Sequence, residues 1–328
     1  MKERSVRIDA MRGIAMVCVV LGHAIQRNLS VHEPFFCFLA SFEMSLFAFV
    51  SGYLTSPPAQ RRFSWIAIRA QRLLIPFFVW APIMWFMSRF SFTGLDVIGI
   101  PSSLLEYIST LLARPYDGLW YLLVLFYWCL FVVLASPFLC RDQWIQVVIG
   151  ACVVGSLWLL VSQVGVPSMY YGRSYFLSLL PYFAAGLAFR YLKLNFAEPV
   201  SPVFTGVSLI MFSIGYGLVI FPSMGSQVFN SEMLSILKGV LGVAASIYFI
   251  LSIQEVRWLS PLASVGRASL GVYAIHLLFL RSGFGHGWTK VSVSFIFALG
   301  LSLFITWLAK HNQVTARLLL GRFPVNSN

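Results

Sequence analysis

The sequence predicts an all-α integral membrane protein of about ten transmembrane helices, with both termini in the cytoplasm. Of its 328 residues, 59% are hydrophobic and only 10% are charged, whereas a soluble domain carries about 25% charged residues. Apolar runs of about 20 residues, the length that crosses a bilayer as a helix, recur along the whole chain. Lys and Arg gather in alternate connections between these runs, as is typical of membrane proteins.

The predicted spans follow one another through short connections, so we expect a single membrane domain over residues 1–328. Turn clusters separate several of them, such as SPP at 56–58, FPSMGS at 221–226 and SGFGHG at 282–287. The spans lie near residues 10–28, 35–54, 65–88, 119–140, 144–162, 175–192, 202–222, 234–253, 264–281 and 291–309.

The segment 97–113 differs from these spans. It is apolar at helical spacing, but it is short, contains Pro101 and carries Glu106. A helix that lies in the outer membrane interface suits these features better than a span does. Counting it as an eleventh span would place the C-terminus outside, against the basic Arg317 and Arg322.

The excess of basic residues orients the protein. The chain carries 23 Lys and Arg against 11 Asp and Glu, a net charge of +12. With the N-terminus inside, about two thirds of the Lys and Arg fall on the cytoplasmic side, where membrane proteins concentrate them. Because most of them lie at helix ends, we expect them to contact anionic lipid headgroups and not nucleic acid. The 5 cysteines show no CxxC pair and no nearby His at ligand spacing, so no metal site is predicted.

Ionisable side chains within the predicted spans are the first candidates for function. Such groups cost several kcal/mol in lipid, so those that occur usually face a bundle interior or a wet cavity. They are Asp9, Arg12, His23, Glu43, Arg69, Arg72, Lys238, Arg267 and His276.

The first helix presents two of these groups on one face. Arg12 and His23 lie 11 residues apart, which at about 100° per residue leaves them within roughly 20° of one direction and about 16 Å apart along the axis. Asp9 precedes Arg12 by three residues and can pair with it, which offsets the desolvation cost of the arginine. The Asp–Arg pair either serves a reaction site or anchors the helix end.

The third helix begins with two arginines on one face. Arg69 and Arg72 are three residues apart near its cytoplasmic end. A helix N-terminus attracts anions, and two guanidiniums add bidentate recognition of phosphate. The alternative is that both arginines only anchor the helix at the membrane surface.

Five segments resemble the acyltransferase family 3 membrane proteins. Residues 7–23, RIDAMRGIAMVCVVLGH, resemble the family's opening Asp-x-x-Arg-Gly element, whose Arg is separated by ten residues from a His. Four further segments resemble later elements of the family in the same order, so the resemblance spans the chain. They are FEMSLFAFVSGYL at 42–54, RAQR at 69–72, GLWYLLVLFYW at 118–128 and SLGVYAIH at 269–276.

This resemblance implies a membrane O-acyltransferase of the bacterial inner membrane. The donor would be an acyl-CoA, usually acetyl-CoA, with no permanently bound cofactor. The acceptor would be a sugar hydroxyl of a cell-surface polysaccharide or of its lipid-linked precursor. His23 would act as general base, since its unperturbed pKa of about 6.5 suits proton removal near neutral pH.

The remaining candidates sort by depth and by chemistry. Arg12, Ser51, Arg69 and Arg72 fall in the inner half, where a phosphorylated donor would enter, and His23, Trp120, Tyr121 and His276 fall in the outer half. Glu43 lies between the two layers. We therefore expect catalytic roles for His23, Asp9, Arg12 and Glu43, donor binding by Arg69, Arg72 and Ser51, and acceptor binding by Trp120, Tyr121 and His276.

Several alternatives stay open on the sequence alone. Trp120 and Tyr121 also suit the membrane interface, where aromatic rings are enriched, and His276 equally suits a structural hydrogen bond. The subgroup that resembles fucose acetylases and the enterobacterial common antigen acetylase often has His and Pro where this chain has Glu43 and Ser45. Glu43 either is catalytic or supports a catalytic group, or the acceptor differs.

Two other classes of membrane protein compete with this prediction. A secondary transporter also buries Asp, Glu, His and Arg, but the two halves of the chain show no clear internal repeat. A glycan flippase or polymerase would need more spans or a large outer loop. Neither the acyl group, the acceptor hydroxyl nor the oligomeric state follows from the sequence.

Overall fold

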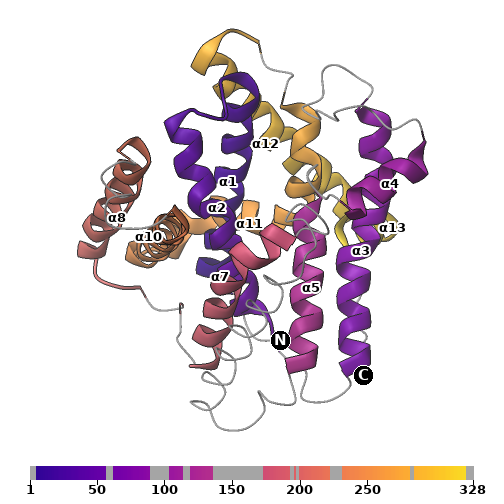
Figure 1. Ribbon diagram of the computed structural model, residues 1–328, viewed down its shortest axis with the longest axis horizontal. Helices are drawn as coiled ribbons and strands as arrows, with labels where there is room; N and C mark the ends of the chain where they lie inside the picture. Colours follow the sequence, from indigo (N-terminus) through magenta and orange to yellow (C-terminus); the bar gives the residue numbers. More distant parts are fainter. Residues whose placement is uncertain are drawn as a thin grey trace.

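The computed structural model describes residues 5–56, 62–88, 103–113, 119–135, 173–192, 196, 199–221, 231–280 and 284–322. Within these ranges all regular structure is helical, which confirms the predicted all-α class (Figure 1). The helices are α1 (Val6–Asn28), α2 (Pro34–Leu54), α3 (Arg62–Met87), α4 (Leu104–Ala113), α5 (Trp120–Ala135), α7 (Arg173–Tyr191), α8 (Val203–Ile220), α10 (Ser231–Ser252), α11 (Ser260–Ile275), α12 (Gly287–His311) and α13 (Gln313–Leu320), with 3₁₀ turns η2 (Val256–Leu259) and η3 (His276–Phe279).

Among the described residues, 7 helical segments are long and apolar enough to cross a membrane. They correspond to the predicted spans at 10–28, 35–54, 65–88, 202–222, 234–253, 264–281 and 291–309. The predicted spans at 119–140 and 175–192 overlap α5 and α7, of 16 and 19 residues. The predicted span at 144–162 lies outside the described residues. The chain is thus a multi-pass membrane protein, while the total of ten spans and the orientation stay predictions.

Helix α4 covers the described part of the segment 97–113. It has 10 residues, with Tyr107 and Leu111 buried and Leu105 and Glu106 exposed. One face is therefore inward and the other outward, as an interfacial helix requires. Its position at the outer surface stays a prediction.

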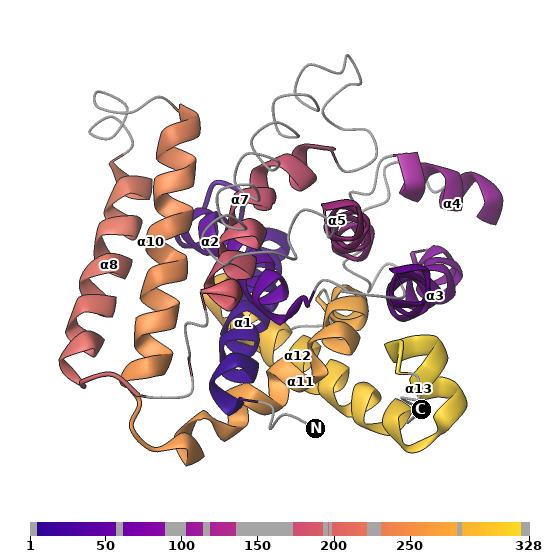
Figure 2. The ribbon, with the colours of Figure 1, turned by 90° about the horizontal axis from the view of Figure 1, so that it is seen from below.

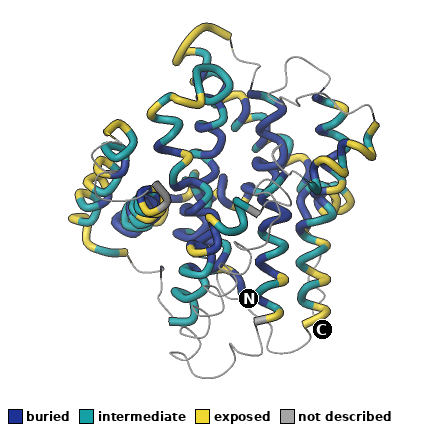
Figure 3. The backbone as a smooth tube through the Cα atoms, in the orientation of Figure 1, coloured by how far each residue is buried: buried dark blue, intermediate teal, exposed yellow. Residues whose placement is uncertain are grey.

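The core of the bundle is built around α1. This helix packs against α2, α11 and α12, while α2 packs against α7 and α10. Helices α8 and α10 lie side by side at one edge of the molecule, and α3, α4 and α13 lie at the other (Figure 2). Burial is deepest along α1, α2 and α11, whereas α8 is almost entirely exposed or of intermediate burial (Figure 3).

Reciprocal glycine contacts join α1 to α11. A Cβ on Gly13 would overlap the backbone carbonyl of Leu262, and a Cβ on Gly266 would overlap that of Asp9. The same arrangement joins α2 to α7, where Gly52 meets Phe183 and Gly186 meets Phe49. Lipid provides no hydrophobic force between helices, so small residues that let backbones touch are a main source of packing energy. The first of these interfaces carries the candidate site.

Candidate active site

Five helices enclose a cavity in the bundle. It has about 410 Å³ of empty space, a figure that includes open solvent at its mouth. Its polar lining comes from Arg12 on α1, Ser51 on α2, Tyr121 on α5, and Ser269 and Tyr273 on α11. The remaining lining is apolar, and it comprises Met16, Met44, Phe47, Leu73, Leu122, Leu125 and Leu270.

Arg12 is fixed to the wall of this cavity. Its Nη2 donates a hydrogen bond of 2.8 Å to the hydroxyl of Ser269, which is only 2% exposed. The bond crosses from α1 to α11 close to the reciprocal contacts of Gly13 and Gly266. A cationic group therefore borders an otherwise largely apolar space.

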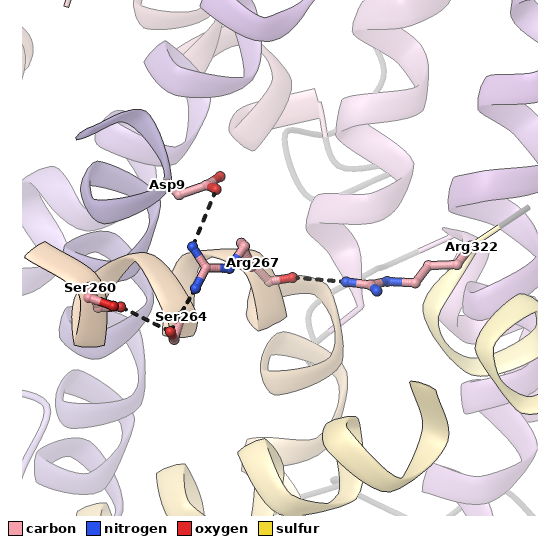
Figure 4. A network of polar contacts seen from close by, with 5 residues as sticks. All are labelled: Asp9, Ser260, Ser264, Arg267 and Arg322. Atoms are coloured by element: carbon pink, nitrogen blue, oxygen red, sulfur yellow. Dashed lines mark hydrogen bonds and ion pairs between the residues drawn. The ribbon is translucent and has the colours of Figure 1, made fainter. Parts of the chain in front are cut away.

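Asp9 forms an ion pair across the same interface. Its Oδ2 lies 3.9 Å from Nη1 of Arg267 on α11, and Nη2 of Arg267 donates to the hydroxyl of Ser264 at 2.8 Å (Figure 4). The side chain of Asp9 is 3% exposed and that of Arg267 is 41% exposed. The sequence predicts a pair between Asp9 and Arg12 within one helix. The structure brings a further arginine, 258 residues along the chain, against the carboxylate, and the pair with Arg12 stays a prediction.

Ser51 and Tyr121 meet inside the bundle. Their hydroxyl oxygens lie 2.9 Å apart, and the backbone N–H of Tyr121 donates to the hydroxyl of Tyr273 at 3.0 Å. The prediction that Ser51 and Tyr121 belong to different halves of the membrane is therefore wrong. Helix α5 begins at Trp120, so its first turn lies beside the last turn of α2.

His23 and His276 lie together beyond the cavity. Their ring centroids are 5.3 Å apart with an interplanar angle of 35°. The ring of Tyr273, which lines the cavity, lies 6.3 Å from that of His276. His23 itself does not line the cavity, because it follows Met16 by two helical turns, or about 10 Å. Tyr273 and His276 thus connect the cavity to His23.

Three contact pairs follow one another in the same order along α1 and along α11 with η3, the turn that continues it. Asp9 meets Arg267, then Arg12 meets Ser269, and finally His23 meets His276. The two helices therefore advance in the same direction. All the ionisable groups predicted on the first helix face this one partner.

Glu43 packs against α1 next to His23. It is 7% exposed, and a Cβ on Gly22 would lie 3.2 Å from its Oε2. Among the described residues, that oxygen has no hydrogen-bond partner. The carboxyl group therefore lies against α1 at Gly22, the residue before His23.

Arg69 and Arg72 are half-buried on α3. The guanidinium of Arg69 lies 4.9 Å from the ring centre of Trp65, a cation–π arrangement. Neither arginine lines the cavity, but Leu73, the residue after Arg72, does. Both arginines therefore lie within about one helical turn of its α3 wall.

Trp120 and Tyr175 form an aromatic stack where α5 meets α7. Their ring centroids lie 4.0 Å apart at an interplanar angle of 17°. Trp120 is half-buried, so one face of the indole is covered by Tyr175. Tyr121, by contrast, is buried and lines the cavity.

Two residues of the cavity were missed as individual candidates in the sequence. Ser269 and Tyr273 precede His276 by seven and three residues, so all three lie on one helical face. That spacing is the signal that could have identified them. Among the described residues, no group of three His, Cys, Asp or Glu side chains could hold a metal ion.

Comparison with known proteins identifies the family. The model of the acyltransferase domain known as acyltransferase family 3 matches residues 5–311. The nodulation protein NolL of Sinorhizobium fredii is 29% identical over 219 residues, which is 64% of this chain and 55% of that protein. NolL of Mesorhizobium japonicum is 30% identical over 91 residues, or 25% of this chain and 24% of that protein. The chain thus spans no more than about half the length of these relatives.

No solved structure matches the chain significantly. The family model, however, includes every residue of α1, α2, α3, α5 and α11 that lines the cavity. It also includes both members of the histidine pair. The chain therefore belongs to acyltransferase family 3 and is a multi-pass membrane protein.

Proposed function

We propose that this acyltransferase moves an acetyl group from cytoplasmic acetyl-CoA to a sugar hydroxyl, with His23 as general base. The acceptor belongs to a cell-surface polysaccharide or to its lipid-linked precursor, and the protein works in the bacterial inner membrane. The observation that carries this proposal is a row of neighbouring side chains, which runs from Tyr273 in the wall of the cavity through His276 to His23.

The cavity has the chemistry that a pantetheine arm requires. Its lining is largely apolar, with a few hydroxyl groups and one guanidinium at the wall. Arg69 and Arg72, one turn from Leu73, are suited to the phosphates of coenzyme A, because guanidiniums bind phosphate in a bidentate manner. Ser51, joined to Tyr121, contributes a polar contact along the arm.

Distance along α1 separates the roles of Arg12 and His23. The two residues are about 16 Å apart along the helix axis, too far for both to contact one thioester carbonyl. Arg12 therefore contacts the donor away from the reacting carbon, and Asp9 supports the helix interface that holds Arg12. His23 is half-buried, so an acceptor hydroxyl can reach it.

His23, the sugar hydroxyl and the thioester together account for every bond and proton of the reaction. His23 removes the proton of the sugar hydroxyl as its oxygen attacks the thioester carbonyl. The carbon–oxygen bond forms, the carbon–sulfur bond breaks, and the coenzyme A thiolate takes the proton from His23. Trp120 offers a ring face against which a sugar can pack, and Glu43 adds a polar group beside the base.

Label transfer tests the proposal. Purified protein in a nanodisc is incubated with radiolabelled acetyl-CoA and a panel of lipid-linked and polymeric glycans. We expect transfer by the unchanged protein and by His32→Ala, whose histidine is exposed, but a loss of 100-fold or more in His23→Ala at equal abundance, roughly the worth of a general base. Full transfer by His23→Ala would exclude the assigned base. Substrate uptake without acyl transfer would favour a transporter.

A further inference from the structure

The end of the described chain docks on α3 at Arg72. Gly321, which follows α13, has a φ of +59°, a left-handed conformation that favours glycine. A Cβ at Gly321 would overlap the backbone carbonyl of Arg72. Further along α3, the indole N–H of Trp80 donates to the carbonyl oxygen of Leu319 at 3.0 Å. These contacts hold the backbone of Arg322, the residue after Gly321, close to that of Arg72.

Arg322 extends from this docking point to α11. Its Nη2 donates to the backbone carbonyl of Arg267, with 3.4 Å between nitrogen and oxygen (Figure 4). Lys310, near the end of α12, lies close enough to Arg267 and Arg322 for both positive charges to act on its ammonium group. These residues come from α11, α12 and the segment after α13. We refer to Arg267, Lys310 and Arg322 as the basic cluster.

The basic cluster holds more positive than negative charge. Helices α3, α11, α12 and α13 contain no Asp or Glu. Helix α1 supplies Asp9, whose Oδ2 lies 3.9 Å from Nη1 of Arg267. Among the described residues, three cations against this one carboxylate leave an excess of two positive charges. Like charges that are held together repel one another, so such a cluster attracts anions.

The basic cluster lies close to the cavity. Arg267 precedes Leu270, which lines the cavity, by three residues, or about one helical turn. Arg72, whose backbone lies next to Arg322, directly precedes Leu73, which lines the cavity from α3. The side chain of Arg267 is partly exposed, and Arg322 is exposed as well. A ligand can therefore place a charged group at the basic cluster while an apolar arm extends into the cavity.

We propose that Arg267, Lys310 and Arg322 bind the 3′-phosphate of the adenosine in coenzyme A. This inference rests on the proposed function, in which Arg69 and Arg72 bind phosphates of the same donor. The ribose of coenzyme A carries both the 3′-phosphate and the 5′-diphosphate that leads to the pantetheine arm, so the donor requires neighbouring phosphate sites. The close approach of Arg72 and Arg322 provides such neighbours, with Arg69 and Arg72 at the diphosphate.

The charge of the basic cluster favours a phosphate monoester. A monoester carries about −1.5 to −2 charges at pH 7, which matches the excess of two positive charges. A phosphodiester, as in a phospholipid, carries only about −1. A guanidinium has several N–H donors, and the contacts of Arg267 with Asp9 and Ser264 engage only some of them. Arg267 and Arg322 can therefore bind the phosphate oxygens directly, while Lys310 adds a point charge.

Binding of two forms of the donor tests this inference. Coenzyme A and dephospho-coenzyme A, which differ only in the 3′-phosphate, are titrated into the purified protein in nanodiscs of phosphatidylcholine, and calorimetry gives each Kd. We expect dephospho-coenzyme A to bind about 10- to 100-fold more weakly, the worth of hydrogen bonds to a charged group. This comparison uses the unchanged protein, so it does not depend on how a variant folds.

Two substitutions locate the contact with the 3′-phosphate. Lys310→Gln and Arg322→Gln should each raise the Kd of coenzyme A about tenfold, but change that of dephospho-coenzyme A by less than about twofold. Lys290→Gln, near the opposite end of α12 and about 30 Å away, is the matched control and should change neither Kd. Arg267 stays unchanged because its pair with Asp9 also joins α1 to α11.

The same titrations can overturn the inference. Equal Kd values of the two ligands in the unchanged protein would show that the 3′-phosphate is not recognised. An equal rise of both Kd values in Lys310→Gln and Arg322→Gln would place the basic cluster at the diphosphate or leave it only a general attraction for anions. Failure of the proposed function has a different result, because neither ligand would then bind.

A lipid headgroup is the other source of phosphate for the basic cluster. Thermal unfolding of the ligand-free protein in nanodiscs of phosphatidylcholine, with and without phosphatidylglycerol, separates the two sources. We expect Lys310→Gln and Lys290→Gln to show the same change in Tm with phosphatidylglycerol as the unchanged protein. A stabilisation that Lys310→Gln alone loses, with equal Kd values of the two ligands, would assign the basic cluster to a headgroup and contradict the inference.

Discussion

The carboxylate of Asp9 on α1 and the guanidinium of Arg267 on α11 form an ion pair between two helices that touch backbone to backbone, with 3.9 Å between Oδ2 and Nη1. The same guanidinium donates to Ser264, and the carbonyl of Arg267 accepts from Arg322, so the pair is part of a network (Figure 4). The ion pair lies about one helical turn from the hydrogen bond between Arg12 and Ser269, which borders the cavity. A change in the ion pair should therefore also affect the geometry of the cavity.

The first prediction concerns this pair. Arg267→Gln leaves a buried carboxylate with one cation fewer, so we expect a loss of about 1–2 kcal/mol in the free energy of unfolding, moderated by the partial exposure of Arg267. Asp9→Asn combined with Arg267→Gln should be more stable than Arg267→Gln alone. Chemical unfolding in detergent measures these values, and Arg257→Gln, from an exposed pair with Glu255, should change by less than about 0.5 kcal/mol. With Asp9→Asn alone as the third variant, a loss in the double variant equal to the sum of the two single losses would show that the pair is not coupled.

The second prediction concerns the glycine contact. Gly266→Ala places a methyl group into the backbone carbonyl of Asp9, so α1 and α11 must separate, at a cost of about 1–3 kcal/mol. Gly300→Ala on α12 meets nothing within 4 Å and should be neutral or slightly stabilising, since alanine favours helix. Thermal unfolding of both variants in one detergent compares them. A Gly266→Ala protein as stable as Gly300→Ala would show that the interface is looser than the structure indicates.

The third prediction concerns donor binding by α3. If Arg69 and Arg72 hold the phosphates of coenzyme A, Arg69→Gln and Arg72→Gln should each raise KM for acetyl-CoA about tenfold or more, the worth of one charge-assisted hydrogen bond. KM for the glycan should stay unchanged. Arg62→Gln removes an exposed charge from the start of the same helix and serves as control. A similar increase in KM for Arg62→Gln would indicate only long-range attraction.

The fourth prediction concerns the indole of Trp120. With one face covered by Tyr175, its other face can pack on a sugar ring, so Trp120→Ala should raise KM for the glycan about 3- to 10-fold, as expected for a single aromatic contact. Trp120→Phe should retain most of the affinity, because a ring remains. Trp258→Ala, at an indole that is 68% exposed, is the control. An unchanged KM in Trp120→Ala would assign the stack to helix packing alone.

The spans were the most predictable part of this fold, for a physical reason. A bilayer requires long apolar segments with internally bonded backbones, and α1, α2 and α12 accordingly match their predicted runs. Depth was less predictable. Tyr121 was placed by counting along an apolar run, whereas its real depth follows from where α5 begins beside Ser51.

Partners between distant helices could not be predicted from spacing alone. Local spacing offers Arg12 as the partner of Asp9, but the pairing with Arg267 depends on how α1 docks against α11. That docking is set by Gly13 and Gly266, which carry no chemical signal of their own. The meeting of His23 with His276 follows from the same docking, so sequence alone identified both histidines but not their contact.

Helix α8 is apolar, but little of its surface is buried against other helices. Only 11% of its most apolar window is buried inside the molecule, and Leu209, Ile210 and Ile214 point away from the bundle. Its outer face therefore needs only apolar side chains that suit lipid, and it does not need side chains that fit a particular packing surface. Exchanges among Leu, Ile, Val and Phe should accumulate there freely during evolution, whereas the opposite face, where Ser208 donates to the carbonyl of Ala245, should change only together with α10.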